Sequence, residues 1–111
     1  MISPGDFHSL AEARSWALHQ EVLARLVEHP ELVARAKQRV AKWLLSPEDH
    51  PYAPAWEELL LGPPDRLHAA LVGKDPHWCT LRQASPFAGA LDSATRWRIL
   101  RQPELRSREA G

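Results

Sequence analysis

Apolar residues recur every three to four positions after the first few residues, which predicts an amphipathic helix. Ser9 precedes Glu12 with the spacing of a capping box, so we expect the helix to begin there. It should end near Glu28, because Pro30 disfavours continuation. The apolar half of this helix carries His19 at its middle, among Trp16, Leu18, Val22, Leu23, Leu26 and Val27.

A second amphipathic helix is predicted from Glu31 to Leu45. Its apolar stripe is formed by Leu32, Val33, Ala36, Val40, Trp43 and Leu44. The opposite surface is basic. The link between the two helices is very short, so we expect them to pack as an antiparallel hairpin.

Shorter helices are expected in the rest of the chain. Residues 46–55 contain three prolines and form a stiff connector. Helices are predicted over 56–61, 63–72, 76–82 and from Asp92 or Ser93 to just before Pro103. No segment alternates between apolar and polar residues, so we expect no sheet.

The pattern therefore predicts an all-α, single-domain bundle over residues 1–111, with about five to six helices. The long N-terminal helical hairpin would be followed by shorter C-terminal helices. Residues 1–8 and 103–111 are expected to be frayed termini.

Composition agrees with one globular domain, since 44% of residues are hydrophobic and 25% are charged. No apolar run is long enough to span a membrane. The first residues lack the basic start and apolar core of a signal peptide. The single cysteine fits a reducing compartment. We therefore expect a cytoplasmic protein that does not bind membranes.

Charge is unevenly distributed, although the formal net charge is zero. Residues 46–81 hold two basic and six acidic residues, whereas residues 82–111 hold six arginines and three acidic residues. The simplest interpretation is a solvated surface or packing of the basic segment on the acidic one. A phosphate-binding surface and contact with an acidic protein are the alternatives.

No group of residues has the spacing of a metal site or a catalytic centre. The six histidines include no zinc-binding pair, and His77 and Cys79 would point apart on a helix. Cys79, close to Trp78 and Leu81, has the surroundings of a small buried hydrophobe. We expect no cofactor, no metal and no enzymatic activity.

His19 needs a polar partner because it lies on an apolar helix face. Ser15 and Glu12, one and two turns earlier, could form a polar ladder with it. One helix cannot arrange such a trio as a catalytic triad around a substrate. We therefore expect a hydrogen-bonded core or interface histidine, with contact to a partner as the alternative.

Five tryptophans lie near apolar stripes, and we expect most of them in the core. In so small a domain, one or two should instead lie at an interface. Trp97 stands between Arg96 and Arg98, an alternation that can stack nucleotide bases. On a helix, however, Trp97 is expected to point inward.

Residues 81–91, LRQASPFAGAL, form the least generic stretch. Ser85 precedes Pro86 as a helix N-cap would, Phe87 is expected to pack under the bundle, and Gly89 permits a positive φ or a close helix approach. The segment is either a packed corner between helices or a recognition loop that uses Arg82 and Gln83. As a helix–turn–helix DNA reader it fits poorly, because its turn is too long.

Three segments together resemble a group of small bacterial helical proteins: LHQEVLARL (18–26), WEELLLGPPDRLHAALV (56–72) and LRQASPFAGALDSATRWRIL (81–100). The most specific feature is an R-Q-x-S-P-F-A-G-x-L loop followed by R-W-x-I. Some members of that group resemble antitoxin-like partners of nucleotidyltransferase-type toxins. The resemblance implies that the chain binds a partner protein. The group has no assigned activity that could be transferred to residues of this chain.

Two functional hypotheses follow. The first is a non-enzymatic interaction module of the antitoxin type, which binds a partner protein through residues of the loop and neighbouring helices: His19, Arg82, Gln83, Ser85, Phe87, Trp97 and Arg98. The second is a small nucleic-acid-binding regulator that uses Arg35, Arg39, Lys42, Arg96 and Arg101 on phosphates. A homodimer is compatible with either hypothesis.

Overall fold

Prolines and small polar residues set the starts of the helices, as the sequence predicts. In the computed structural model, which describes residues 9–102, Ser9 caps the first helix and accepts a hydrogen bond from the Glu12 backbone N–H at 3.1 Å. Prolines occupy the first turn of three later helices, where their missing N–H leaves no hydrogen bond unmade. The six helices are α1 (Leu10–Leu26), α2 (Glu31–Trp43), α3 (Ala53–Leu61), α4 (Pro64–Val72), α5 (Pro76–Arg82) and α6 (Ser93–Leu100).

The expected all-α, single-domain fold is confirmed, with no strand in the described part of the chain. The prediction that residues 1–8 and 103–111 fray lies outside the described residues. In the same range, no helix combines the length and apolar character needed to cross a bilayer.

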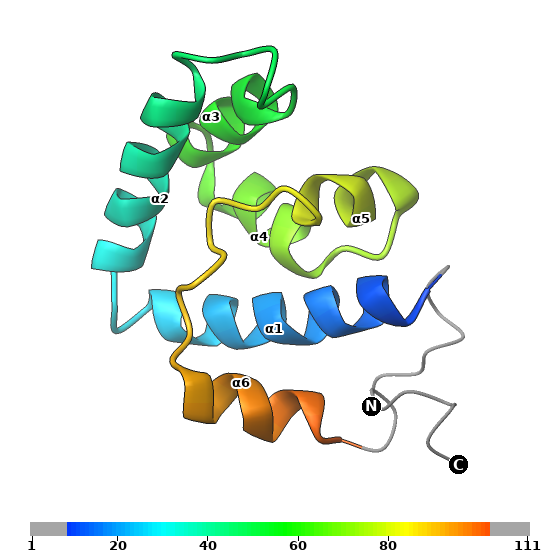
Figure 1. Ribbon diagram of the computed structural model, residues 1–111. Helices are drawn as coiled ribbons and strands as arrows, with labels where there is room; N and C mark the ends of the chain where they lie inside the picture. The colour runs from blue at the N-terminus through cyan, green and yellow to red at the C-terminus, as the bar shows by residue number, and fades with distance from the viewer. Residues whose placement is uncertain (1–8, 103–111) are drawn as a thin grey trace.

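The long helix α1 lies at the centre of the arrangement. It contacts α4 and α5 on one side and α6 on the other (Figure 1). The expected hairpin is open, because α2 turns steeply away from α1 after Pro30 and packs chiefly on α3. The stripe of Leu32, Ala36 and Val40 is buried, and packing on α3 supplies more apolar contact than α1 alone.

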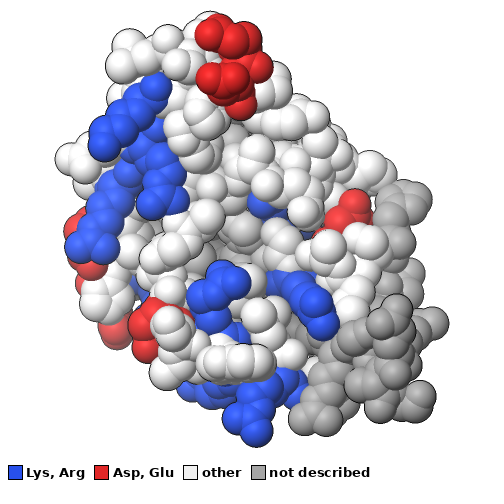
Figure 2. Space-filling model, in the orientation of Figure 1, with Lys and Arg blue, Asp and Glu red and all other residues white. Residues whose placement is uncertain are grey.

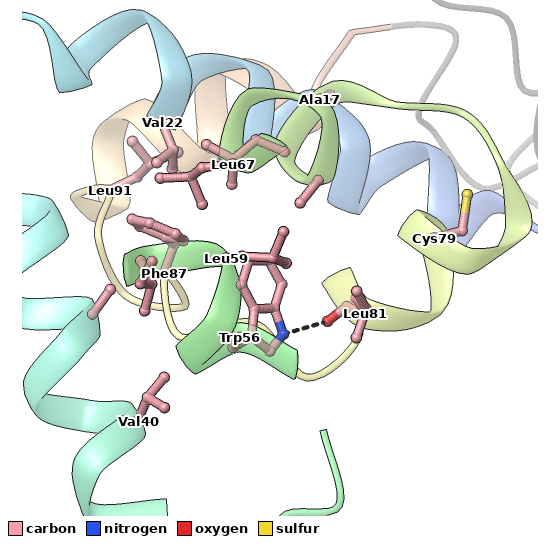
Figure 3. Packing of buried hydrophobic residues seen from close by; sticks show 14 of the residues in the cluster. Ala17, Val22, Val40, Trp56, Leu59, Leu67, Cys79, Leu81, Phe87 and Leu91 are labelled. Atoms are coloured by element: carbon pink, nitrogen blue, oxygen red, sulfur yellow. Dashed lines mark hydrogen bonds between the residues drawn. The ribbon is translucent and has the colours of Figure 1, made fainter. Parts of the chain in front are cut away.

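The core is centred on Trp56, which is fully buried. Its indole N–H donates to the Leu81 carbonyl at 3.1 Å, and its ring meets Phe87 edge to face at 6.3 Å. Figure 3 shows these side chains converging from α3, α5 and the segment after α5. Trp56 therefore holds three distant parts of the sequence together.

The other tryptophans differ in burial. Trp16, Trp43 and Trp78 are half-buried against the core. Trp97, expected to point inward, is instead 66% exposed on α6. The prediction for Trp97 was wrong because α6 buries only Thr95 and Ile99, and Trp97 lies on its opposite side.

The segment between α5 and α6 passes from one side of α1 to the other (Figure 1). Ser85, Pro86, Phe87 and Leu91 are buried in it. Gly89 has a φ of 83°, in the left-handed region that side chains rarely adopt, which confirms the role expected of this glycine. The corner is thus packed and held in one specific backbone path.

Candidate functional site

The residues predicted to bind a partner fall into two groups. His19, Arg82, Ser85 and Phe87 are buried and belong to the interior of the molecule. The exposed ones are Gln83, Trp97 and Arg98. The packed-corner interpretation therefore fits the four buried side chains, and partner contact through the loop stays a prediction.

A hydrogen-bonded network ties the loop to α1. The Ser15 carbonyl can only accept, so the His19 Nδ1–H donates to it at 2.7 Å. Nε2 must then accept, and it does so from the Ser85 hydroxyl at 2.7 Å. The Ser85 oxygen in turn accepts from the Phe87 backbone N–H at 3.0 Å. His19 does not bond to Glu12, so the predicted polar ladder ends at Ser15.

Burial lowers the pKa of His19 to about 4, and the positive charge of Arg82 acts in the same direction, against the opposing effect of the Ser15 hydrogen bond. A histidine with so low a pKa is a weak base near neutral pH. A peptide carbonyl stands where a catalytic triad has a carboxylate. These features favour a structural role for Ser85 and His19, which is to pin the loop against α1.

Arg82 is the most unusual of the buried residues, with only 3% of its surface exposed. Its guanidinium donates to the Ala70 carbonyl at 2.9 Å and to Cys79 Sγ at 3.5 Å, and its Nε has no hydrogen-bond partner. Among the described residues, no carboxylate lies within ion-pair distance of it. Burial lowers the pKa of Arg82 below its ordinary value. Cys79 and the negative charge of Glu12 act in the opposite direction and favour the charged guanidinium.

Arg82 lines a pocket with a volume of about 580 Å³. The pocket lies between α1 and the 83–91 segment, and it reaches the connector before α3 and the side of α6 that carries Arg96 and Leu100. Figure 2 shows the molecule hollowed near the middle of this face, with basic side chains in and around the hollow. Its apolar wall includes Leu18, Val22, Phe87, Leu91 and Leu100, and its cationic groups include Arg14, Arg82 and Arg96.

Several pocket residues were not singled out in the sequence. They are Arg14 on the first helix and residues 49–53, which were expected only to form part of a connector. Arg14 lies three residues after Ala11 and four before Leu18, so these three residues share one side of the helix. This spacing is only a weak sequence signal that Arg14 lines the pocket. Residues 49–53 reach the pocket because of the way α2 and α3 pack, and no pattern in the sequence of the connector itself predicts this.

A second feature is the outer face of α6. Ala94, Trp97, Arg98 and Arg101 line a shallow hollow there. The Arg98 guanidinium is 4.0 Å from a Glu21 carboxylate oxygen and remains mostly exposed. Tryptophan and arginine are the residue types most enriched at energetically important interface positions.

The predicted nucleic-acid residues are all exposed: Arg35, Arg39, Lys42, Arg96 and Arg101. Arg39 donates a hydrogen bond to the Ala88 carbonyl, and Arg96 lines the pocket beside Ala88 and Gly89. Arg39 of α2 and Arg96 of α6 therefore both lie near the Ala88 loop. Figure 2 shows lysine and arginine over both helices on one face.

Cys79 is buried, and burial raises the pKa of its thiol, which disfavours the reactive thiolate. Its S–H donates to the Lys74 carbonyl at 3.6 Å. No cluster of three or more histidine, cysteine or acidic side chains that could hold a metal ion occurs within residues 9–102.

No protein-family model matches the chain, and comparisons with curated proteins and with solved structures likewise find no match.

Proposed function

We propose that the protein is a non-enzymatic interaction module that binds a partner protein through the outer face of α6. The observation that carries the proposal is Trp97, two-thirds exposed in a hollow that it shares with Arg98 and Arg101. Exposing a large indole to water is unfavourable, and covering it with a partner would recover that free energy. The resemblance to antitoxin-like proteins supports the same class of function.

The chemistry of this face indicates what the partner presents. The indole offers a flat apolar contact, and the two guanidinium groups favour carboxylates beside it. A matching surface would carry an apolar side chain flanked by Asp or Glu. In protein interfaces, the Trp and Arg residues that contribute most to affinity typically lie near the centre of the contact.

Substitution of Trp97 should therefore weaken partner binding strongly. We expect Trp97→Ala to raise the Kd by roughly 30-fold or more, since an interface tryptophan typically contributes about 2 kcal/mol or more. The tagged protein would first be used to isolate a stoichiometric partner from nuclease-treated lysate of the source cells. The Kd of the purified pair would then be measured by titration calorimetry.

The matched control is Leu61→Ala on α3. Leu61 is 69% exposed, comparable to Trp97, but it lies on a helix at the other end of the molecule (Figure 1). Its loss should leave the Kd unchanged. Equal affinity of the wild type and Trp97→Ala would refute the proposed face, and retention of a second copy of this chain would identify the protein as its own partner.

The second candidate function, a nucleic-acid-binding regulator, is favoured by the convergence of α2 and α6 on the Ala88 loop. Four exposed cations supply the phosphate contacts: Arg35, Arg39, Lys42 and Arg96. Binding of this kind is dominated by counter-ion release and weakens steeply as salt rises.

The salt dependence tests this function directly. Replacing Arg35, Arg39 and Lys42 together with glutamine should make the slope of log K against log salt shallower by about 0.9 for each lost phosphate contact. Lys37→Gln is the matched control, because Lys37 lies on the same helix but faces Glu57 and Leu61. Fluorescence anisotropy with a labelled DNA duplex measures the slope. An affinity that does not change between low and physiological salt contradicts the hypothesis.

A further inference from the structure

The pocket beside α1 combines an apolar wall with arginine side chains. Arg82 is buried at the wall of the pocket, where its terminal nitrogens donate to the Ala70 carbonyl and to Cys79 Sγ, so it contributes positive charge to the pocket. Arg96 lines the same pocket, and its side chain makes no hydrogen bond or ion pair with any described residue. Asp49 is the only acidic residue in the described lining, and it is exposed.

We propose that this pocket binds a small organic acid, with its carboxylate on Arg96 and attracted by the charge of Arg82, and its apolar body against α1 and the 85–91 segment. The volume of about 580 Å³ lies within the range of small-molecule sites, roughly 300–1,000 Å³. The site is distinct from the α6 face, so it does not depend on the function proposed above.

The choice of a carboxylate over other ligands follows from the lining. A guanidinium matches a carboxylate in shape and can bind it with two parallel hydrogen bonds. The wall of Leu18, Val22, Phe87, Leu91 and Leu100 favours an apolar body over a multiply charged nucleotide or sugar phosphate. Gln83, exposed at the rim, adds amide groups that can hydrogen-bond a polar substituent.

The pocket also has a fixed shape without a ligand. The His19–Ser85–Phe87 network holds its loop wall on α1, and Gly89 fixes the turn at its edge. Preformed walls reduce the conformational entropy that binding must remove. A ligand of the right size should therefore bind without rearranging the backbone.

The test uses 4-phenylbutanoate as the probe and 4-phenylbutanamide, its neutral analogue of nearly the same shape, as the comparison. Calorimetry and amide NMR shifts would be recorded on the full chain. We expect the acid to bind at least about tenfold more tightly than the amide, which corresponds to about 1.4 kcal/mol. The shifted signals should come from Ser15, His19 and residues 83–91.

Arg96→Gln, an exposed substitution, should weaken binding of the acid several-fold without affecting the fold. Arg82→Met should also weaken it, because the substitution removes a positive charge at the pocket wall, and thermal unfolding would verify that the variant remains folded. Arg66→Gln is the matched control, since Arg66 lies on α4 and pairs with Glu58 away from the pocket. Its affinity for the acid should equal that of the wild type.

Three results would overturn the proposal. Equal binding of acid and amide would show a merely apolar cavity, and affinity independent of Arg96 and Arg82 would place the carboxylate elsewhere. Tighter binding of an acetylated Asp-Glu-Leu-Phe peptide than of the acid, with the same shifted signals, would assign the pocket to a protein segment. Failure here would leave the α6 proposal intact, because that proposal is tested with Trp97.

Discussion

Replacing Trp56 with alanine should lower the free energy of unfolding by about 3–5 kcal/mol, the largest effect we expect from any single substitution in this chain. Trp56 is fully buried, packs edge to face on Phe87 and donates its N–H to the Leu81 carbonyl. Alanine removes all of these contacts and leaves a cavity between α3, α5 and the loop. Urea unfolding followed by far-UV circular dichroism measures the change.

A domain of this size has a total stability of roughly 5–15 kcal/mol, so Trp56→Ala could unfold the protein outright. Trp56→Phe retains part of the ring and should cost less, because the Leu81 carbonyl keeps a second donor in the Ala84 N–H. Trp97→Ala is the matched control and should change stability by less than about 0.5 kcal/mol, since its side chain is mostly exposed. Similar losses for Trp56→Ala and Trp97→Ala would contradict the assignment of the core.

The contrast between these two tryptophans shows what the sequence can and cannot predict. Helix boundaries follow from local signals such as Ser9, Pro64, Pro76 and Asp92, and the observed helices begin at or next to them. Trp97 has the same helical spacing as a core residue. Its exposure depends on which side of the short helix α6 faces α1, and no local pattern specifies that choice.

The candidate site could be predicted only in part, for a similar reason. The loop residues Ser85, Phe87 and Gly89 stood out in the sequence, and so did His19 as a histidine in need of a partner. Their pairing joins positions far apart in the chain and depends on how the loop passes over α1. The open angle between α1 and α2, which brings the 49–53 connector to the pocket, also comes from tertiary packing.

Loss of stability in mild acid should follow from the same network. The pKa of His19 in the folded protein is lowered to about 4 from an ordinary value of 6.5, so between these values the unfolded chain binds a proton that the folded protein does not. The folded state is therefore favoured above pH 6.5 and loses this advantage as the pH falls toward 4. The expected contribution is about 2 kcal/mol by pH 5 and about 3 kcal/mol in full.

The measurement compares urea unfolding of the wild type and His19→Gln from pH 7 to pH 5. Glutamine can still donate to Ser15 and accept from Ser85, but it does not titrate, so the stability difference between the two proteins should shrink by about 2 kcal/mol over this interval. His68→Gln, at an exposed histidine on α4, should show no such change. A difference that stays constant with pH would mean that His19 accepts a proton in the folded protein as readily as in the unfolded chain. In that case the Ser85 hydroxyl would have to turn from donor to acceptor, and the loop would be held to α1 by a charged histidine.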